Sequence, residues 1–115
     1  LYQTDSTTYY FSFSTTNNND PRLIYKIQSN LIKNSKEYPS NWRENDGIVN
    51  TISMPGPNNS MIKDYDGFIE KGIWQHMDKI NLDHNEIIGH HINRKKKNDL
   101  KEFYLNHCSL IYTLN

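Results

Sequence analysis

Two short polar segments limit the folds open to this chain more than any other feature of its sequence. One, Glu44-Asn45-Asp46-Gly47, places an acid and a glycine directly before an apolar run over residues 48–54. The other, Leu82-Asp83-His84-Asn85-Glu86, places a histidine in a polar stretch that follows an apolar run over residues 72–77. Loops held by rigid strands are where reactive side chains are concentrated. The order strand, acid, strand, histidine and helix predicts the C-terminal part of an α/β sheet.

Apolar patterning predicts three strands. Aromatic residues partly alternate with small polar ones over residues 9–14, as in a strand with one buried face. Residues 48–54 and 72–77 are two further apolar runs of strand length. Pro55-Gly56-Pro57 ends the first of these runs, because proline cannot continue a central strand. The segments over residues 15–20, 34–45, 58–66 and 79–85 are polar, and we expect them to be loops.

Apolar residues with helical spacing occur twice. The first set predicts a short helix or a turn and consists of Leu23, Ile24, Ile27 and Leu31. The second set predicts a final helix over residues 99–110 and consists of Leu100, Phe103, Tyr104, Cys108 and Ile111. Asn98 or Asp99 would be the N-cap of this helix, and His107 would pack or lie at its surface. The basic run over residues 94–97 lacks interleaved aromatic residues, so we expect a solvated loop there.

Composition excludes several functional classes. Thirteen Lys and Arg residues balance thirteen Asp and Glu residues, so no net charge favours nucleic acid or a membrane as partner. No apolar run approaches the roughly 18–20 residues that cross a bilayer. Hydrophobic residues make up 35% of the 115 residues, which is low for a self-sufficient globule. An α/β sheet cut to its last strands would also leave edges and one apolar face unpaired, so we expect the isolated chain to be loosely packed or prone to aggregation.

Asp46 and His84 are the candidate catalytic residues. In a hydrolase triad the acid accepts a hydrogen bond from the histidine ring, which fixes its tautomer and stabilises the imidazolium formed during proton transfer. The chain order acid then histidine is the order of the α/β-hydrolase fold, where the nucleophile comes first. Each residue also has an ordinary structural reading. Asn-Asp-Gly is a common turn sequence, and His84 is one of five histidines in the chain.

The nucleophile of such a triad is missing from the chain. No serine stands in a Gly-x-Ser-x-Gly segment, which forms the strained turn that presents the hydroxyl. Cys108, the only cysteine, lies on the apolar face of the predicted final helix, so we expect a buried and unreactive thiol. We therefore interpret residues 1–115 as part of one α/β domain whose nucleophile portion lies upstream. The isolated chain would then be inactive.

The histidines near Glu86 suggest a weaker alternative, a small metal-binding domain. His84, Glu86, His90 and His91 lie close together in the sequence, but their spacing is not a standard zinc pattern. We rank this possibility below an ester hydrolase, and below a non-catalytic binding or structural module derived from one.

Several sequence segments, taken in order, resemble one protein family. They are Tyr9-Tyr10-Phe11-Ser12-Phe13-Ser14-Thr15, Glu44-Asn45-Asp46-Gly47-Ile48-Val49-Asn50-Thr51-Ile52-Ser53-Met54, Gly56-Pro57, Tyr65-Asp66-Gly67, Lys71-Gly72-Ile73-Trp74, Asp83-His84-Asn85-Glu86-Ile87-Ile88-Gly89 and Phe103-Tyr104-Leu105. Together they are similar to the C-terminal part of the large secreted bacterial triacylglycerol lipases of the staphylococcal and thermophilic-bacillus type. The resemblance spans most of the chain.

The resemblance implies an α/β-hydrolase fold and the hydrolysis of lipid esters with long acyl chains. Asp46 matches the triad acid of the family and His84 matches its triad base. Glu86 matches a calcium ligand, and a carboxylate suits that hard cation. Secretion and transient contact with a lipid interface are also implied, and the nucleophile, oxyanion hole, lid and zinc site of the family would lie upstream of Leu1.

This sequence departs from the family pattern at the calcium site. The family carries an Asp-Pro pair just past the glycine that follows the histidine, and here those positions are His91 and Ile92. The segment before Glu44, which supplies a backbone calcium ligand in the family, is also shorter. Calcium at Glu86 is therefore expected to lack one side-chain ligand of the family.

Overall fold

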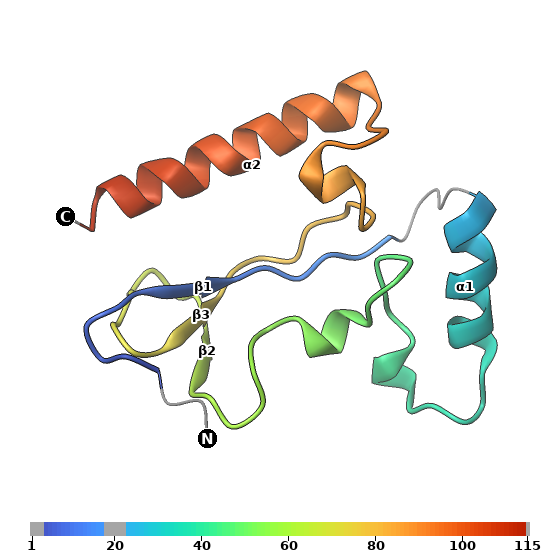
Figure 1. Cartoon of the computed structure of the whole chain (residues 1–115), viewed down its shortest axis with the longest axis horizontal. Coiled ribbons are helices and arrows are strands. Elements are labelled where there is room, and N and C mark those ends of the chain that lie inside the picture. Colours follow the sequence, from blue (N-terminus) through green and yellow to red (C-terminus); the bar gives the residue numbers. More distant parts are fainter. Residues whose placement is uncertain (1–3, 18–22, 115) are drawn as a thin grey trace.

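The computed structural model describes residues 4–17 and 23–114. Three short strands, two α-helices and three single-turn 3-10 helices (η) make up this part of the chain (Figure 1). In chain order they are β1 (Tyr10–Ser12), α1 (Leu23–Asn34), η1 (Ser40–Trp42), η2 (Thr51–Ser53), β2 (Ile62–Asp64), β3 (Trp74–His76), η3 (Glu86–Ile88) and α2 (Arg94–Tyr112).

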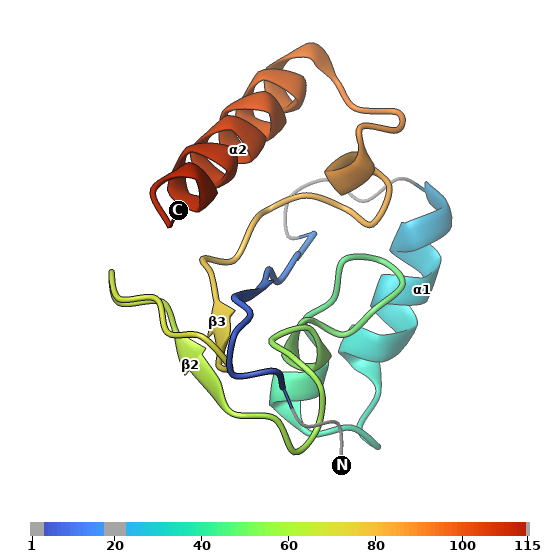
Figure 2. The ribbon, with the colours of Figure 1, turned by 60° about the vertical axis from the view of Figure 1, so that its left-hand side comes forward.

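The three strands form one parallel sheet in the order β1-β3-β2 (Figure 2). Phe11 lies beside Gln75 in β3, and Gln75 lies beside Lys63 in β2. Parallel pairing needs a crossover connection between strands that neighbour each other, which is the hallmark of α/β architecture. The strands predicted over residues 9–14 and 72–77 are confirmed as β1 and β3.

The pairing of β1 with β3 continues past the ends of both strands. The Ile80 N–H donates to the Ser14 carbonyl over 2.8 Å, and the Thr16 N–H donates to the Ile80 carbonyl over 2.9 Å. The Asn17 N–H then donates to the carbonyl of Asn45 over 3.0 Å. Because the carboxyl ends of parallel strands meet at one edge of a sheet, this ladder brings the loops around residues 46 and 84 together.

Aromatic contacts pack helix α2 against β1 and against Phe13, which follows the strand. Phe13 meets the rings of Phe103 and His107 edge-on, with centroids 4.8 Å apart in both pairs, and Phe11 meets His107 at 5.0 Å. Such edge-to-face pairs are favourable beyond the apolar area that they bury. The predicted packing role of His107 matches this arrangement.

The helix begins earlier than the sequence pattern predicted. Asn93 is its N-cap, and the Asn93 side-chain oxygen accepts a hydrogen bond from the Lys96 N–H over 2.9 Å. The expectation of a solvated loop over residues 94–97 is therefore wrong, because the Asn93 cap lets the first turn form there. The expectation of a buried Cys108 is also wrong, since its side chain is exposed.

Two further predictions about the strands need correction. Residues 48–54 form no strand but a turn followed by η2, because the Asp46 carboxylate accepts hydrogen bonds from the N–H groups of Ile48 and Val49 and bends the backbone. Strand β2 lies inside the segment over residues 58–66 that was predicted as a loop. Residues 15–17 of another predicted loop are buried and extend the sheet ladder, whereas its residues 18–20 lie outside the described residues.

The interior of the described chain is mostly polar. Among residues 4–17, 26–27 and 30–114, whose burial is described, the buried hydrophobic side chains are Leu82 and Leu100. The buried polar and charged residues are more numerous: Ser12, Ser14, Thr15, Thr16, Asn17, Asn45, Asp46, Thr51, Gln75, Asp83 and Glu86. Hydrogen bonds around Asp46 and Glu86, rather than a large apolar core, therefore organise the centre of this fold.

Acid should loosen α2 through His107. Burial lowers the pKa of this histidine from its ordinary value of 6.5, because desolvation disfavours the charged ring. The unfolded chain then binds a proton that the folded chain does not bind, so the stability from the neutral ring is present above pH 6.5 and lost as the pH falls through the lower folded pKa. Thermal unfolding of the full-length protein between pH 7.5 and 5 should show a falling Tm.

A His107→Phe variant should flatten that pH dependence, because phenylalanine keeps the edge-on aromatic contacts and does not titrate. The exposed His90 offers a control, since a His90→Gln variant should keep the pH dependence of the parent protein. An unchanged slope in His107→Phe would show that other groups cause the acid sensitivity.

Candidate active site

Asp46 is buried and its carboxylate accepts four hydrogen bonds. Its side chain and backbone together are 2% exposed. Oδ1 accepts from the N–H groups of Ile48 at 3.0 Å and Val49 at 2.9 Å, and Oδ2 accepts from the Thr15 hydroxyl at 2.9 Å. His84 provides the fourth partner. A buried carboxylate with this many donors is held in one orientation.

The local sequence explains why Asp46 sits on so tight a loop. Gly47 has a φ of 105°, in a region that favours glycine because a side chain there is strained. Its N–H donates to the side-chain oxygen of Asn45 over 3.0 Å, and the Asn45 side chain donates in turn to the Arg43 carbonyl over 2.9 Å. The Asn-Asp-Gly segment therefore does form a turn, and that turn orients the acid.

His84 meets Asp46 through both its ring and its backbone. The Nδ1 atom of the ring lies 3.0 Å from Asp46 Oδ2, and the His84 N–H donates to the Asp46 carbonyl over 3.1 Å. The side chain of His84 is 43% exposed, while that of Asp46 is 2% exposed. The sequence hypothesis that these two residues meet in space thus agrees with the geometry; a catalytic role for them stays a prediction.

The chemistry of the contact assigns the tautomer of His84. An ionised carboxylate only accepts hydrogen bonds, so Nδ1 must carry the proton that it donates. In the neutral ring Nε2 then has a free lone pair. In this tautomer Nε2 is the ring nitrogen that can accept a proton, which is what a general base requires.

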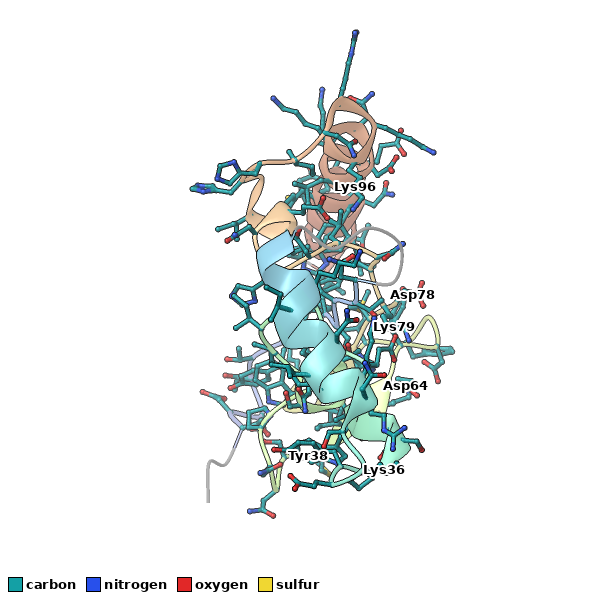
Figure 3. The ribbon with its side chains drawn as sticks, turned by 90° about the vertical axis from the view of Figure 1, so that its right-hand side faces the viewer. Lys36, Tyr38, Asp64, Asp78, Lys79 and Lys96 are labelled. Carbon is teal, nitrogen blue, oxygen red and sulfur yellow. The ribbon has the colours of Figure 1, made fainter. Side chains whose placement is uncertain are left out.

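Glu86 is buried close to His84 and has a cationic partner. Lys96 Nζ lies 3.0 Å from Oε1 and 2.8 Å from Oε2 of Glu86, so one ammonium contacts both oxygens of the carboxylate. Figure 3 labels Lys96, which reaches Glu86 in η3 from the first turn of α2. Oε2 also accepts the N–H of Asp83 over 2.9 Å.

Calcium fits these residues poorly. A hard cation needs six to eight oxygen ligands, and here a lysine ammonium already occupies the position next to both Glu86 oxygens. His91, at the family position of the second side-chain ligand, would offer nitrogen instead of oxygen. Among residues 4–17 and 23–114, no group of three His, Cys, Asp or Glu side chains is arranged to hold a metal ion. The predicted role of Glu86 as a calcium ligand stays a prediction.

The structure contains a second Ser-His-Asp arrangement, which the sequence did not lead us to expect. The Ser14 hydroxyl lies 2.8 Å from His76 Nε2, and His76 Nδ1 lies 3.0 Å from Asp64 Oδ1. Strand pairing places Asp64 beside His76, and Ser14 lies two residues past Ser12, which is the β1 partner of His76. No spacing in the sequence signals this set. Ser14 is 1% exposed, so a substrate cannot reach its hydroxyl. We interpret the set as a structural tie between strands.

The part of the chain that the structure describes contains no helix long and apolar enough to cross a membrane.

Comparison with known proteins identifies relatives that match most of this chain. A family model described as "Lipase-like, C-terminal domain" matches residues 2–112. A lipase of Staphylococcus epidermidis is 33% identical over 85 residues, which are 71% of this chain and 12% of that protein. Lipase 1 of Staphylococcus aureus strain Mu50 is 39% identical over 66 residues, 56% of this chain and 9% of that protein. The chain thus spans about a tenth of the length of these curated relatives.

Two solved structures share the fold. EstA from Clostridium botulinum is 30% identical, with a TM-score of 0.71, and the match covers 93% of this chain and 29% of EstA. Staphylococcus hyicus lipase is 23% identical with a TM-score of 0.75, and the match covers 95% of this chain and 32% of that one. The predicted fold class, a C-terminal portion of an α/β fold, is confirmed.

Proposed function

Because this chain belongs to the family of lipase-like C-terminal domains, as its sequence resemblance predicted, we propose that it supplies the acid and the base of a Ser-His-Asp ester hydrolase. The 3.0 Å contact between Asp46 Oδ2 and His84 Nδ1 carries this proposal. It joins a buried, fully hydrogen-bonded carboxylate to a half-exposed imidazole, which is the asymmetry that a triad requires.

The reaction that we propose uses a serine from the portion of the protein upstream of Leu1. Nε2 of His84 removes the proton of the serine hydroxyl as its oxygen attacks the ester carbonyl. The resulting imidazolium is stabilised by Asp46, and it gives the proton to the departing alcohol as the acyl-enzyme forms. Water then attacks the acyl-enzyme with the same base, which releases the carboxylic acid and regenerates the serine.

The substrate class follows from the family. We propose lipid esters such as triacylglycerols, hydrolysed by a secreted enzyme in transient contact with a lipid surface. In this proposal residues 1–115 form the C-terminal part of a single α/β-hydrolase domain, and the nucleophile and oxyanion hole come from its other part. The names of the staphylococcal relatives support lipase activity for those proteins, and the shared family supports extending it to this one.

The full-length protein tests the proposal directly. It should hydrolyse p-nitrophenyl esters and incorporate a fluorophosphonate probe at one serine, while the 115-residue chain alone should do neither. The alternative is a non-catalytic module derived from the lipase fold. A full-length protein that folds, takes up no probe and releases no nitrophenol would support this alternative and contradict ours. A burst of nitrophenol from the isolated chain would contradict the assignment of the nucleophile to the upstream portion.

A further inference from the structure

The carboxylate of Glu86 has a charged partner that the proposed reaction does not use. Glu86 is 6% exposed, and an isolated charge at that depth would be costly. The Lys96 ammonium contacts both of its oxygens, at 3.0 and 2.8 Å. The side chain of Lys96 is itself 23% exposed, so the pair lies mostly out of water. Buried pairs of this kind are weak contributors when intact but strongly disruptive when one partner is removed.

Glu86 is connected to His84 through the backbone of the same loop. Its Oε2 accepts the N–H of Asp83, the residue just before His84. Asp83 Oδ1 accepts the N–H groups of Asn85 at 2.8 Å and Glu86 at 2.9 Å. His84 therefore stands between two residues whose positions are fixed by carboxylates, and one of these carboxylates is anchored by Lys96.

Lys96 belongs to a rigid element. Its N–H donates to the Asn93 cap, and Leu100, one turn further along α2, is buried. The ammonium is thus placed by a helix that the aromatic contacts of Phe103 and His107 hold against β1. Lys95 and Lys97, on either side, are exposed.

We propose that Lys96 is a positioning residue: its ammonium is the built-in counter-ion of Glu86 and holds the His84 loop against Asp46 without a metal ion. The expected effect of Lys96 on turnover rests on the proposed function. Its expected effect on the order of the His84 loop does not. A displacement of about 1 Å in a catalytic group can cost a hundredfold in rate, so a loosened His84 loop should lower kcat and leave substrate binding unchanged.

The test compares Lys96→Met with Lys95→Met and Lys97→Met in the full-length protein. Lys96→Met should lower kcat by about tenfold to a hundredfold at unchanged KM, and should lower the Tm by about 5–10 °C. It should also broaden the low-field NMR resonance of the His84 Nδ1 proton, which a His84→Gln variant assigns. The two control variants should resemble the parent protein in all three measurements.

Chemical rescue separates charge from packing. In a Lys96→Ala variant, propylammonium replaces the missing part of the side chain and should restore turnover and the sharp His84 resonance, while 1-propanol should not. The parent protein should have the same Tm and activity with and without millimolar calcium. This last measurement needs no variant, so it decides the question even if the Lys96 substitutions prevent folding.

Each result bears on the proposal. A parent protein whose Tm and activity rise on addition of calcium would show that calcium, not Lys96, balances Glu86, and would overturn the proposal. A Lys96→Met variant indistinguishable from Lys95→Met would overturn it as well. Absence of ester turnover in a folded parent protein would contradict the proposed function alone, because the Tm and the His84 resonance would still report whether Lys96 orders the loop.

Discussion

Replacing His84 with alanine in the full-length protein should lower kcat for p-nitrophenyl ester hydrolysis by about 10⁶-fold, since loss of the base leaves the serine hydroxyl protonated. KM should change little, because His84 contributes proton transfer rather than binding. The measurement is the steady-state rate of nitrophenol release by purified protein. A variant that keeps more than a hundredth of the parent rate would exclude His84 as the base.

His76 is the matched control for this substitution. It is also a histidine that contacts an aspartate, with Nδ1 3.0 Å from Asp64, and its other nitrogen contacts Ser14. Its place in the sheet gives it a structural role only, so His76→Ala should keep kcat within a few-fold of the parent at a temperature where both proteins are folded. Equal losses in both variants would indicate that turnover fails through unfolding.

Replacing Asp46 with asparagine should lower kcat by about 10⁴-fold. The amide can still accept the hydrogen bonds from Ile48 and Val49, so the loop keeps its shape. Its NH₂ group would then face His84 and Thr15. Because this group donates hydrogen bonds, Nδ1 of His84 would have to accept, and the ring proton would move to Nε2, which could then no longer accept the serine proton. Turnover measured across the pH range should stay low at every pH, because no neutral tautomer with a free Nε2 is favoured.

Asp64→Asn provides the control for the acid. Asp64 also contacts a histidine, but its side chain is 93% exposed, so water screens the pair. This variant should therefore retain the parent kcat. If Asp46→Asn retained the parent rate as well, the contact between Asp46 and His84 would be structural, and the proposed function would lose its main support.

The sequence allowed the approach of Asp46 and His84 to be predicted because two independent signals agreed. The chain order acid then histidine is the order of the α/β-hydrolase triad, and the family resemblance matched the same two residues to one site. The Gly47 turn added a local reason for the position of the acid. Strong local patterns of this kind predicted β1, β3 and α1 as well.

Other features depend on tertiary contacts that leave no local pattern. Residues 48–54 are apolar enough for a strand, but the Asp46 carboxylate takes two of their N–H donors and prevents it. Strand β2 forms in a polar segment because β3 offers it an edge. The ion pair of Lys96 and Glu86 connects α2 to the His84 loop. The basic run over residues 94–97 gave no indication that one of its side chains would pair with a buried carboxylate.

The polar centre of this fold has an evolutionary consequence. In many enzymes the reactive groups are a strained addition to an apolar scaffold, and changes that relax them raise thermostability while lowering the rate. In this chain the side chains that orient Asp46, His84 and Glu86 also make up much of the buried interior. Substitutions that relax these hydrogen bonds should therefore lower thermostability and rate together, so selection for either property preserves the same contacts.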